Sequence, residues 1–313
     1  MAGTRKGKYK ITNWSKYNES LVQRGSLTFW FSEEVIRQWH HDNAHPRRGH
    51  PFFFSDTAIE CLLVLREVFR LPYRQTEGLG RSLVGLMGAQ IEIPDYTSLA
   101  KRAEKLGIAL EVRKHTGPID VVVDSTGLKV FGEGEWKMRK HGKSKRRTWR
   151  KLHLAINPAT QEIEAETLTE NSSDDGSQAE PLLTQVPGSI NAFYGDGGYD
   201  KWKVYETLHQ RGTKAIIPPQ RNAKIKQHGN SNRSPLSRDV ALRDIRRHGR
   251  RKWKETIGYH RRSLSETAMY RVKCCFGDHL KNRLLPNQQT EARLRCKILN
   301  TFTQIGLPQF EWI

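Results

Sequence analysis

The spacing of apolar residues between Ser32 and Leu106 has a helical period, which predicts a helical region in the first part of the chain. Ser32, followed by two glutamates, is suited to begin one helix, and Ser55 with Asp56 is suited to cap a second. The second helix has a broad apolar face, formed by Ile59, Leu62, Leu63, Leu65, Val68 and Phe69. A third helix is expected from about Gln75 to Leu86.

A fourth helix is expected from Tyr96 to Leu106, after a turn that contains Pro94. The third and fourth helices have the order of a helix-turn-helix motif, in which the second helix docks on DNA. In that interpretation four polar side chains face phosphates or base edges, namely Thr97, Ser98, Lys101 and Arg102. A plain helical hairpin would have the same pattern, so both interpretations stay open.

From Ile119 onward the pattern changes to the short apolar runs that are typical of strands. The expected strands are Ile119–Asp124, Lys151–Ile156, Glu162–Leu168, Ala192–Asp196 and Lys214–Ile217. The expected helices in this part are Asp200–Gln210, Tyr259–Phe276 and Gln289–Phe302. A hairpin followed by strands that alternate with helices predicts an α+β or α/β fold, with a mixed sheet covered by helices.

The excess of basic residues in the composition indicates a polyanionic partner. The chain contains 53 Lys and Arg residues against 33 Asp and Glu residues, a formal net charge of +20. Nucleic acid is the commonest partner of so basic a soluble protein. No apolar run is long enough to span a membrane, and the first residues lack the apolar core of a signal peptide, so we expect a cytoplasmic protein without a membrane partner.

The cysteines give no sign of a metal site. Cys61, Cys274, Cys275 and Cys296 lack the CxxC and Cys/His spacings of zinc ligands, and we expect them to pack as small apolar residues.

Two stretches are strongly basic, residues 137–151 and 221–254. A single run of this kind usually belongs to a solvated loop, but two runs that flank acidic strands favour contact with the DNA backbone. The side chains expected to make these contacts are Lys143, Lys145, Arg146, Arg147, Arg246, Arg247, Arg250 and Arg251.

Three acids stand where a metal site would place them. Asp124 ends one expected strand and Asp196 ends another, and both are followed closely by glycine. If these strands are neighbours, the two carboxylates repel one another and a divalent cation is the natural compensation. The third acid, Glu266, lies in the helix expected at 259–276, where Tyr259, Arg262, Glu266 and Lys273 fall within an arc of about 60° at about 100° per residue. Each acid alone would be read as a cap, a turn residue or a surface acid.

The spacing Tyr259-x2-Arg262-x3-Glu266-x6-Lys273 resembles the signature of DDE transposases from bacterial insertion sequences, of the family-five type. Asp124 in Val-Asp-Ser-Thr-Gly and Asp196 in Gly-Asp-Gly-Gly-Tyr are similar to the first and second acids of those enzymes. The resemblance covers essentially the whole chain. It implies a ribonuclease-H-like catalytic domain, with Asp124 on its first strand and Asp196 on its fourth.

The resemblance also implies the chemistry and the partners. Asp124, Asp196 and Glu266 would bind two Mg²⁺ ions, for which Mn²⁺ can substitute, and Tyr259, Arg262 and Lys273 would be auxiliary residues. The substrates would be double-stranded DNA, both the inverted repeats of the element and the target DNA, at the bacterial nucleoid. The chain would act as a dimer or larger oligomer in a synaptic complex.

The corresponding organisation is a basic arm at 1–20, a helical DNA-binding domain at 21–116, a catalytic domain at 117–285 with a basic insert at 221–254, and a helical tail at 286–313. Two alternatives share many of these features: a ribonuclease-H-like nuclease or resolvase that cuts without joining, and a DNA-binding regulator that has lost catalysis. A small-nucleotide enzyme is disfavoured because the chain has no GxxxxGK[ST] loop.

Overall fold

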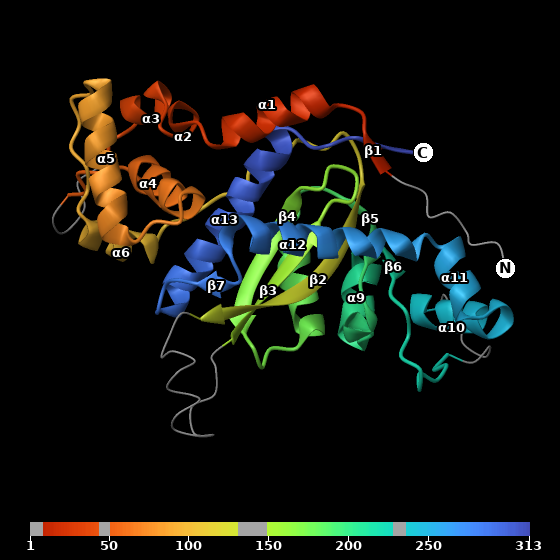
Figure 1. Cartoon of the computed structure of the whole chain (residues 1–313). Helices are drawn as coiled ribbons and strands as arrows, with labels where there is room; N and C mark the ends of the chain where they lie inside the picture. Colours follow the sequence, from red (N-terminus) through yellow and green to blue (C-terminus); the bar gives the residue numbers. More distant parts are fainter. Residues whose placement is uncertain (1–8, 44–50, 131–148, 228–235) are drawn as a thin grey trace, which may run out of the picture. The chain divides into compact units, whose positions relative to one another are not determined.

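The computed structural model describes residues 9–43, 51–130, 149–227 and 236–313. The chain forms two compact units, one from Met1–Ile108 with Ile298–Ile313 and the other from Ala109–Lys297. No helix in the described residues is long and apolar enough to cross a membrane. Figure 1 shows the elements with their labels.

The first unit is built mainly from helices, as expected. They are α1 (Trp14–Arg24), α2 (Leu27–Trp30), α3 (Glu33–Arg37), α4 (Asp56–Val68), α5 (Tyr73–Met87) and α6 (Tyr96–Ala103), and the strands β1 (Tyr9–Ile11) and β8 (Phe310–Trp312) pair antiparallel. The capping predictions are confirmed, because the side chains of Ser32 and Ser55 accept hydrogen bonds from the first turns of α3 and α4. Helix α1 begins at Trp14, within the segment expected to be an arm.

Helix α4 is the centre of this unit, because nine of its 13 residues are buried. Helices α5 and α6 pack against it. A Cβ at Gly80 of α5 would lie 3.1 Å from both Leu62 and Ile93, so the absence of a side chain there allows the close approach of α5. The turn before α6 ends at Asp95, whose carboxylate caps the helix.

The second unit contains a mixed six-stranded sheet, which confirms the expected fold class. Its strands are β2 (Ile119–Val130), β3 (Trp149–Ile156), β4 (Ile163–Glu170), β5 (Ile190–Tyr194), β6 (Lys214–Ile216) and β7 (His279–Leu280). The order is β4-β3-β2-β5-β6, with β7 paired to β2. The β2–β3 and β3–β4 pairs are antiparallel, and the β2–β5 and β5–β6 pairs are parallel. Strand β2, the first strand of this sheet in sequence, therefore lies in its middle. The hairpin strands β3 and β4 lie on one side of it, and β5, the fourth strand in sequence, lies on the other.

Helices cover both faces of this sheet (Figure 1). Apolar residues of α8 (Ala179–Gln185) and α9 (Trp202–Gln210) pack on one face, in a core with Val121, Val123 and Phe193. On the other face α12 (Ser263–Phe276) contacts β2 and β3. The long helix α13 (Leu285–Ile305) follows, and it contributes residues to both units.

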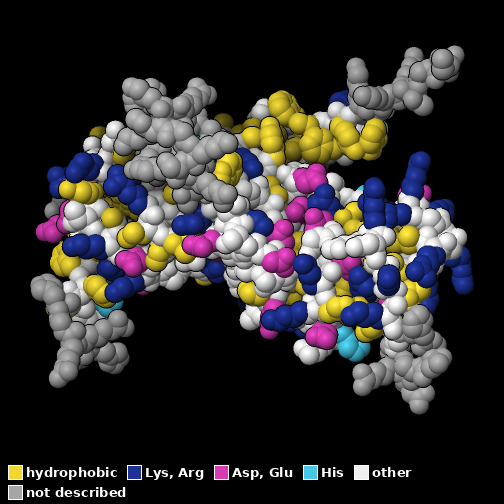
Figure 2. Space-filling model, turned by 90° about the horizontal axis from the view of Figure 1, so that it is seen from below, with side chains coloured by type: hydrophobic (Ala, Val, Ile, Leu, Met, Phe, Trp, Pro, Cys, Tyr) yellow, Lys and Arg dark blue, Asp and Glu magenta, His cyan; other side chains and the backbone are white. Residues whose placement is uncertain are grey.

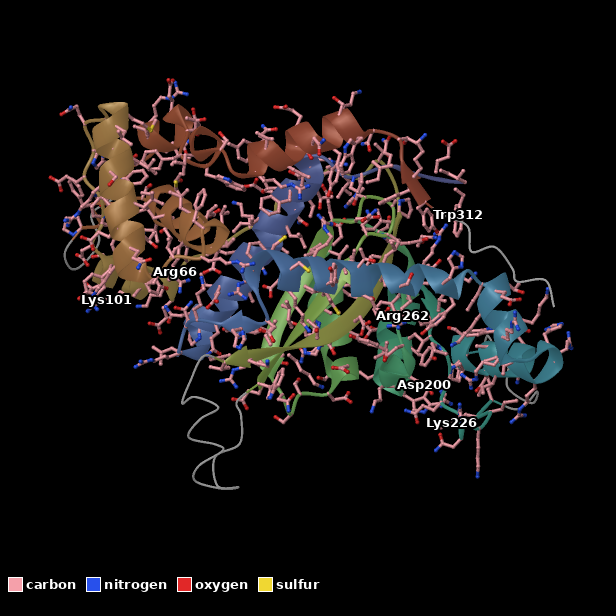
Figure 3. The ribbon with its side chains drawn as sticks, in the orientation of Figure 1. Arg66, Lys101, Asp200, Lys226, Arg262 and Trp312 are labelled. Atoms are coloured by element: carbon pink, nitrogen blue, oxygen red, sulfur yellow. The ribbon has the colours of Figure 1, made fainter. Side chains whose placement is uncertain are left out.

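Two helices occur in the basic insert, where none was expected. They are α10 (Ser237–His248) and α11 (Arg250–Thr256). Helix α10 is joined to the sheet domain by Asp200, a buried carboxylate that accepts hydrogen bonds from Arg238 Nε at 2.7 Å, Tyr205 Oη at 3.1 Å and the Gln220 amide at 2.8 Å. Lys226 lies 4.2 Å from the centre of the Trp202 ring in the same region, and Figure 3 labels Asp200 and Lys226 there.

Candidate active site at the acidic cluster

Asp124 lies on β2, and Asp196 follows β5, the strand that pairs in parallel with β2. In the parallel pairing of β2 with β5, Val122 is opposite Tyr194, and each acid follows its paired residue by two positions. Strand β5 ends at Tyr194, so Asp196 lies in the loop after it rather than at the strand end that was expected. Strand β2 continues past Asp124 to Val130, because its pairing with β3 extends to Lys129. The expected end of β2 at Asp124 was therefore wrong.

Near Asp124, the parallel partner of β2 changes from β5 to β7. Strand β2 pairs with β5 only as far as Val122, and its pairing with β7 begins at Lys129. Among the described residues, no strand pairs with β2 on this edge between those two points. Asp124 thus lies on the part of β2 between its two parallel partners, where the side chains of Arg262 and Ser265 from the α12 region reach it.

Several groups hold the Asp124 carboxylate. Its Oδ1 accepts from the Ser125 amide at 2.8 Å, and its Oδ2 accepts from Arg262 Nη1 at 2.6 Å and from Ser265 Oγ at 3.1 Å. Burial raises the pKa of Asp124, and the charge of Asp196 raises it further, while the hydrogen bond from Ser125 and the charge of Arg262 act in the opposite direction. Asp196 is therefore among the charges that disfavour the ionised form of Asp124.

The third acid, Glu266, comes from α12 and is linked to Asp124 by a shared arginine. The guanidinium of Arg262 forms ion pairs with both Asp124 and Glu266. The side chain of Glu266 is 59% exposed, whereas those of Arg262 and Asp124 are 23% and 16% exposed. Figure 3 labels Arg262 at the start of α12. Arg262 and Glu266 were expected on one face of the helix, and they form an i,i+4 ion pair there.

The helix expected at 259–276 consists of two parts, so the prediction of one regular helix was wrong. Residues Tyr259–Arg262 form a 3₁₀ turn, η3, and the α-helix starts at Ser263. Gly258 precedes the turn with a φ of +68°, and tightened turns of this kind are common at helix N-termini.

The two other signature residues have different surroundings. Tyr259 packs beside the apolar cluster that includes Val122 and Tyr194, and burial raises its pKa to about 12. Lys254 lies 4.8 Å from the centre of its ring. Lys273 is half-buried on α12 and forms no ion pair with any residue of the described ranges.

The glycines after Asp196 allow a close turn. Asp196 precedes η2 (Gly197–Tyr199), and its Oδ1 accepts from the Gly198 amide at 2.8 Å. A Cβ at Gly198 would lie 2.9 Å from this oxygen, closer than real Cβ contacts, whereas a Cβ at Gly197 would meet nothing within 3.7 Å. Gly198 is thus required for the position of the Asp196 carboxylate.

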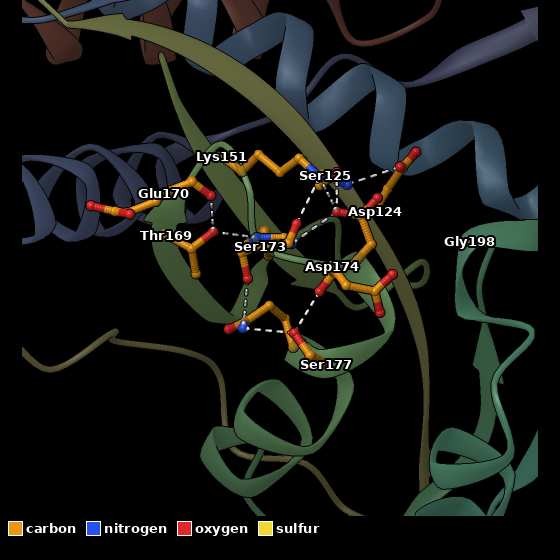
Figure 4. Close-up of polar contacts among 12 residues, drawn as sticks. Asp124, Ser125, Lys151, Thr169, Glu170, Ser173, Asp174, Ser177 and Gly198 are labelled. Carbon is orange, nitrogen blue, oxygen red and sulfur yellow. Dashed lines mark hydrogen bonds and ion pairs between the residues drawn. The ribbon is translucent and has the colours of Figure 1, made fainter. Parts of the chain in front are cut away.

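Sequence reasoning missed a further group of polar residues beside Asp124. Asp175 begins the short helix η1 (Asp175–Gln178) after β4. Its Oδ1 accepts from Ser125 Oγ at 3.0 Å and from Lys151 Nζ at 3.2 Å. Figure 4 shows Ser125 and Lys151 beside Asp124. The only sequence signal was a pair of acids soon after an expected strand, a weak signal because acids also cap helices there.

The residues expected to contact DNA from α6 are partly engaged within the first unit. The hydroxyls of Thr97 and Ser98 both hydrogen-bond to Asp95. The guanidinium of Arg102 pairs with Asp56. Lys101 is exposed.

The basic insert presents its arginines to solvent. Arg246, Arg247 and Arg251 are exposed and Arg250 is half-buried, near the junction of α10 and α11. In the space-filling view, Lys and Arg side chains are crowded over the end of this unit that carries these helices (Figure 2). Lys143, Lys145, Arg146 and Arg147 lie outside the described residues.

The described residues do not form a cluster of ligands already arranged around a metal position. Within residues 9–43, 51–130, 149–227 and 236–313, no three Asp, Glu, His or Cys side chains converge as metal ligands do. Arg262 instead stands between Asp124 and Glu266. The cysteines behave as expected of packing residues at Cys61 and Cys296, which are buried, whereas Cys274 is exposed.

Comparison with protein families decides the identity of the chain. Two family models with the description transposase DDE domain match it, one over residues 22–133 and the other over residues 115–301. The second match alone covers more than half of the sequence. The chain belongs to the DDE transposase family.

The predicted function is therefore confirmed at the level of the family. The protein is a DDE transposase, an enzyme that cleaves DNA and transfers strands, and enzymes of this family generally use divalent metal ions. The assignment to insertion-sequence family five stays a prediction. Among solved structures, a cryo-EM structure of the piggyBac transposase synaptic complex with hairpin DNA is similar at 11% identity, over 96% of this chain and 80% of that one, with a TM-score of 0.43. So loose a match adds nothing to the family assignment.

Proposed function

We propose that this DDE transposase binds the inverted repeats of its element, cleaves at their ends and joins the freed 3′-OH to target DNA, with Asp124, Asp196 and Glu266 as the ligands of two Mg²⁺ ions. The observation that supports the proposal is the parallel pairing of β2 with β5, because Asp124 and Asp196 each follow the last pair, Val122 and Tyr194, by two residues. Glu266 is linked to the same place through Arg262.

The donor set fits a magnesium site. Mg²⁺ and Mn²⁺ prefer oxygen ligands, and all three proposed ligands are carboxylates. Asp124 is largely buried, and its pKa is raised by burial and by the nearby charge of Asp196. A divalent cation would relieve both penalties, because it supplies positive charge where two partly desolvated carboxylates repel.

When bound, such ions activate the attacking hydroxyl group and stabilise the negative charge on the leaving oxygen. The residues of the chain then have separable tasks. Ser125 and Ser265 orient Asp124 through their hydrogen bonds. Arg262 keeps Asp124 and Glu266 facing one another. Lys273 is available to hold a phosphate near the scissile bond, and Tyr259, packed against the cluster of Val122 and Tyr194, would position the DNA backbone or a base.

DNA binding is assigned to two surfaces. The arginines of the α10–α11 insert, Arg246, Arg247, Arg250 and Arg251, suit a duplex backbone because most of them are exposed and closely spaced. Lys101 on α6 suits a second contact, as expected of a helix-turn-helix recognition helix, and we include Thr97, Ser98 and Arg102 with it. Pairing two element ends requires at least a dimer of this chain.

The test uses a labelled duplex that carries the inverted repeat flanking the gene. The native chain and Glu266→Gln are incubated with it and a target plasmid in Mg²⁺, and then in EDTA. We expect nicks at the repeat end and joined products from the native chain in Mg²⁺ alone. Nicks without joined products would show a nuclease or resolvase instead, and equal products from Glu266→Gln would remove Glu266 from the site.

A further inference from the structure

A fourth carboxylate, that of Asp175, lies beside the proposed metal ligands. Its Oδ1 is held by Ser125 Oγ and Lys151 Nζ, at 3.0 and 3.2 Å. Ser125 also donates its amide to Asp124, so a single residue connects the two acids. The second oxygen of Asp175 lies 3.7 Å from the position that a Cβ would take at Gly198, and the Oδ1 of Asp196 lies 2.9 Å from the same position. Asp175 is therefore hydrogen-bonded to Ser125, which also holds Asp124, and its second oxygen lies near the Gly198 turn, which holds Asp196.

A buried phenol points to a polar ligand at this cluster. Tyr199 is only 1% exposed, and its hydroxyl has no hydrogen-bond partner among the described residues. Tyr199 ends the short η2 turn that Asp196 precedes. Burial raises the pKa of Tyr199, and the charges of Asp175, Asp124, Asp196 and Asp174 raise it further. A buried hydroxyl without a partner is costly, and it is expected where a ligand or its coordinated water completes the hydrogen bond.

A buried histidine stands on the other side of the same carboxylate. His153 has no exposed surface, its Nε2 is hydrogen-bonded to Thr169 Oγ1 at 2.9 Å, and its Nδ1 lies 3.7 Å from Asp175 Oδ1. The Nδ1 atom of His153 has no hydrogen-bond partner among the described residues. Within the described ranges, Lys151 is the Lys or Arg side chain that lies within ion-pair distance of Asp175.

The carboxylates of Asp124, Asp175 and Asp196 outnumber the cations that pair with them in the described residues. Arg262 pairs with Asp124, and Lys151 pairs with Asp175. Asp196 accepts a backbone hydrogen bond but forms no ion pair with a described residue. The three carboxylates of Asp124, Asp175 and Asp196 thus share two cations, and Arg262 also pairs with Glu266. An additional cation is the natural compensation.

We propose that Asp175 is a fourth carboxylate of the metal site, and that its side chain converges with those of Asp124 and Asp196 on a divalent cation when one binds. Ser125 and Lys151 fix one oxygen, and the other is directed toward the Gly198 turn, where Asp196 lies. The proposal rests on the proposed function, since it extends the same site from three acids to four.

The test is Mn²⁺ binding by the full-length chain without DNA, measured by titration calorimetry and electron paramagnetic resonance. We expect Asp175→Asn to weaken binding at least about tenfold, the minimum effect known for groups that merely orient a ligand. The matched control is Asp174→Asn, because Asp174 is the preceding residue, is 54% exposed and pairs with Lys201. Its binding should equal that of the native chain.

A second readout separates a ligand from a residue that only positions Lys151. Replacement of a direct ligand lets water enter the coordination shell, so the water-proton relaxation caused by each bound Mn²⁺ should increase in Asp175→Asn. An unchanged relaxation would overturn the proposal. If circular dichroism shows that Asp175→Asn does not fold, Asp175→Ser is measured with the same criteria.

The outcomes distinguish this inference from the proposed function. Native-like binding by Asp175→Asn, with binding lost in Asp124→Asn and Asp196→Asn, would remove Asp175 from the site and leave the three-acid site intact. Native-like binding by all three variants would contradict the proposed metal site itself.

Discussion

Arg262 offers a direct test of the charge arrangement at the site. Its guanidinium pairs with Asp124 at 2.6 Å and also with Glu266. The pair with Asp124 is largely buried, with side chains 23% and 16% exposed, whereas Glu266 is 59% exposed. Removing one partner of a fully buried pair costs roughly 3–5 kcal/mol, and exposed pairs contribute at most about 1 kcal/mol. We therefore expect Arg262→Gln to lower the free energy of unfolding by about 2 kcal/mol.

The assay is urea unfolding in the presence of EDTA, with the variants Arg262→Gln, Asp124→Asn, Glu266→Gln and the double variant of Arg262 and Asp124. Glu266→Gln should cost less than about 1 kcal/mol, because only the exposed pair is lost. The double variant should be more stable than the sum of its single changes predicts, by at least about 1 kcal/mol, because no buried charge is left unpaired.

Two results would refute this reasoning. One is an Arg262→Gln variant as stable as the native chain, and the other is a double-mutant cycle with additive effects. Mg²⁺ gives an independent check of the same idea. It should stabilise Arg262→Gln more than the native chain, because the metal would supply the positive charge that the substitution removed.

Three other predictions concern different parts of the catalytic unit. Gly198→Ala should abolish strand cleavage because its Cβ would displace the Asp196 carboxylate, while Gly197→Ala should retain cleavage in the same assay. Asp200→Ala should lower the free energy of unfolding by about 3–5 kcal/mol, because a buried arginine loses its partner, and should speed limited proteolysis around α10. Burial raises the pKa of Glu166 to about 7 from 4.5, so its contribution to stability is complete below pH 4.5 and is lost as the pH rises through 7. Urea titrations should therefore show native stability falling over this range relative to Glu166→Gln, by about 1.4 kcal/mol per unit of pKa shift.

The local features of the fold were readable from the sequence because short-range interactions determine them. Ser32 and Ser55 cap helices through hydrogen bonds within one turn, so their type and position were sufficient. The spacing of Arg262 and Glu266 likewise determined that the two side chains meet on one helical face. The helices of the basic insert were missed because charged residues dominate their sequence, and only a few positions, such as Leu242 and Trp253, are buried.

The sequence by itself thus determined the capped helices and the basic character of the chain, and it predicted the three signature acids. Only the tertiary structure decided that the segments before Asp124 and Asp196 are neighbours, because the pairing of two parallel strands joins segments far apart in the chain. It also decided that Asp175 lies beside Ser125 and Lys151, since the segment after β4 reaches β2 and β3 through these contacts. Contacts of this kind have no periodic signature, because they arise from how separate elements pack and not from the spacing of residues within one element.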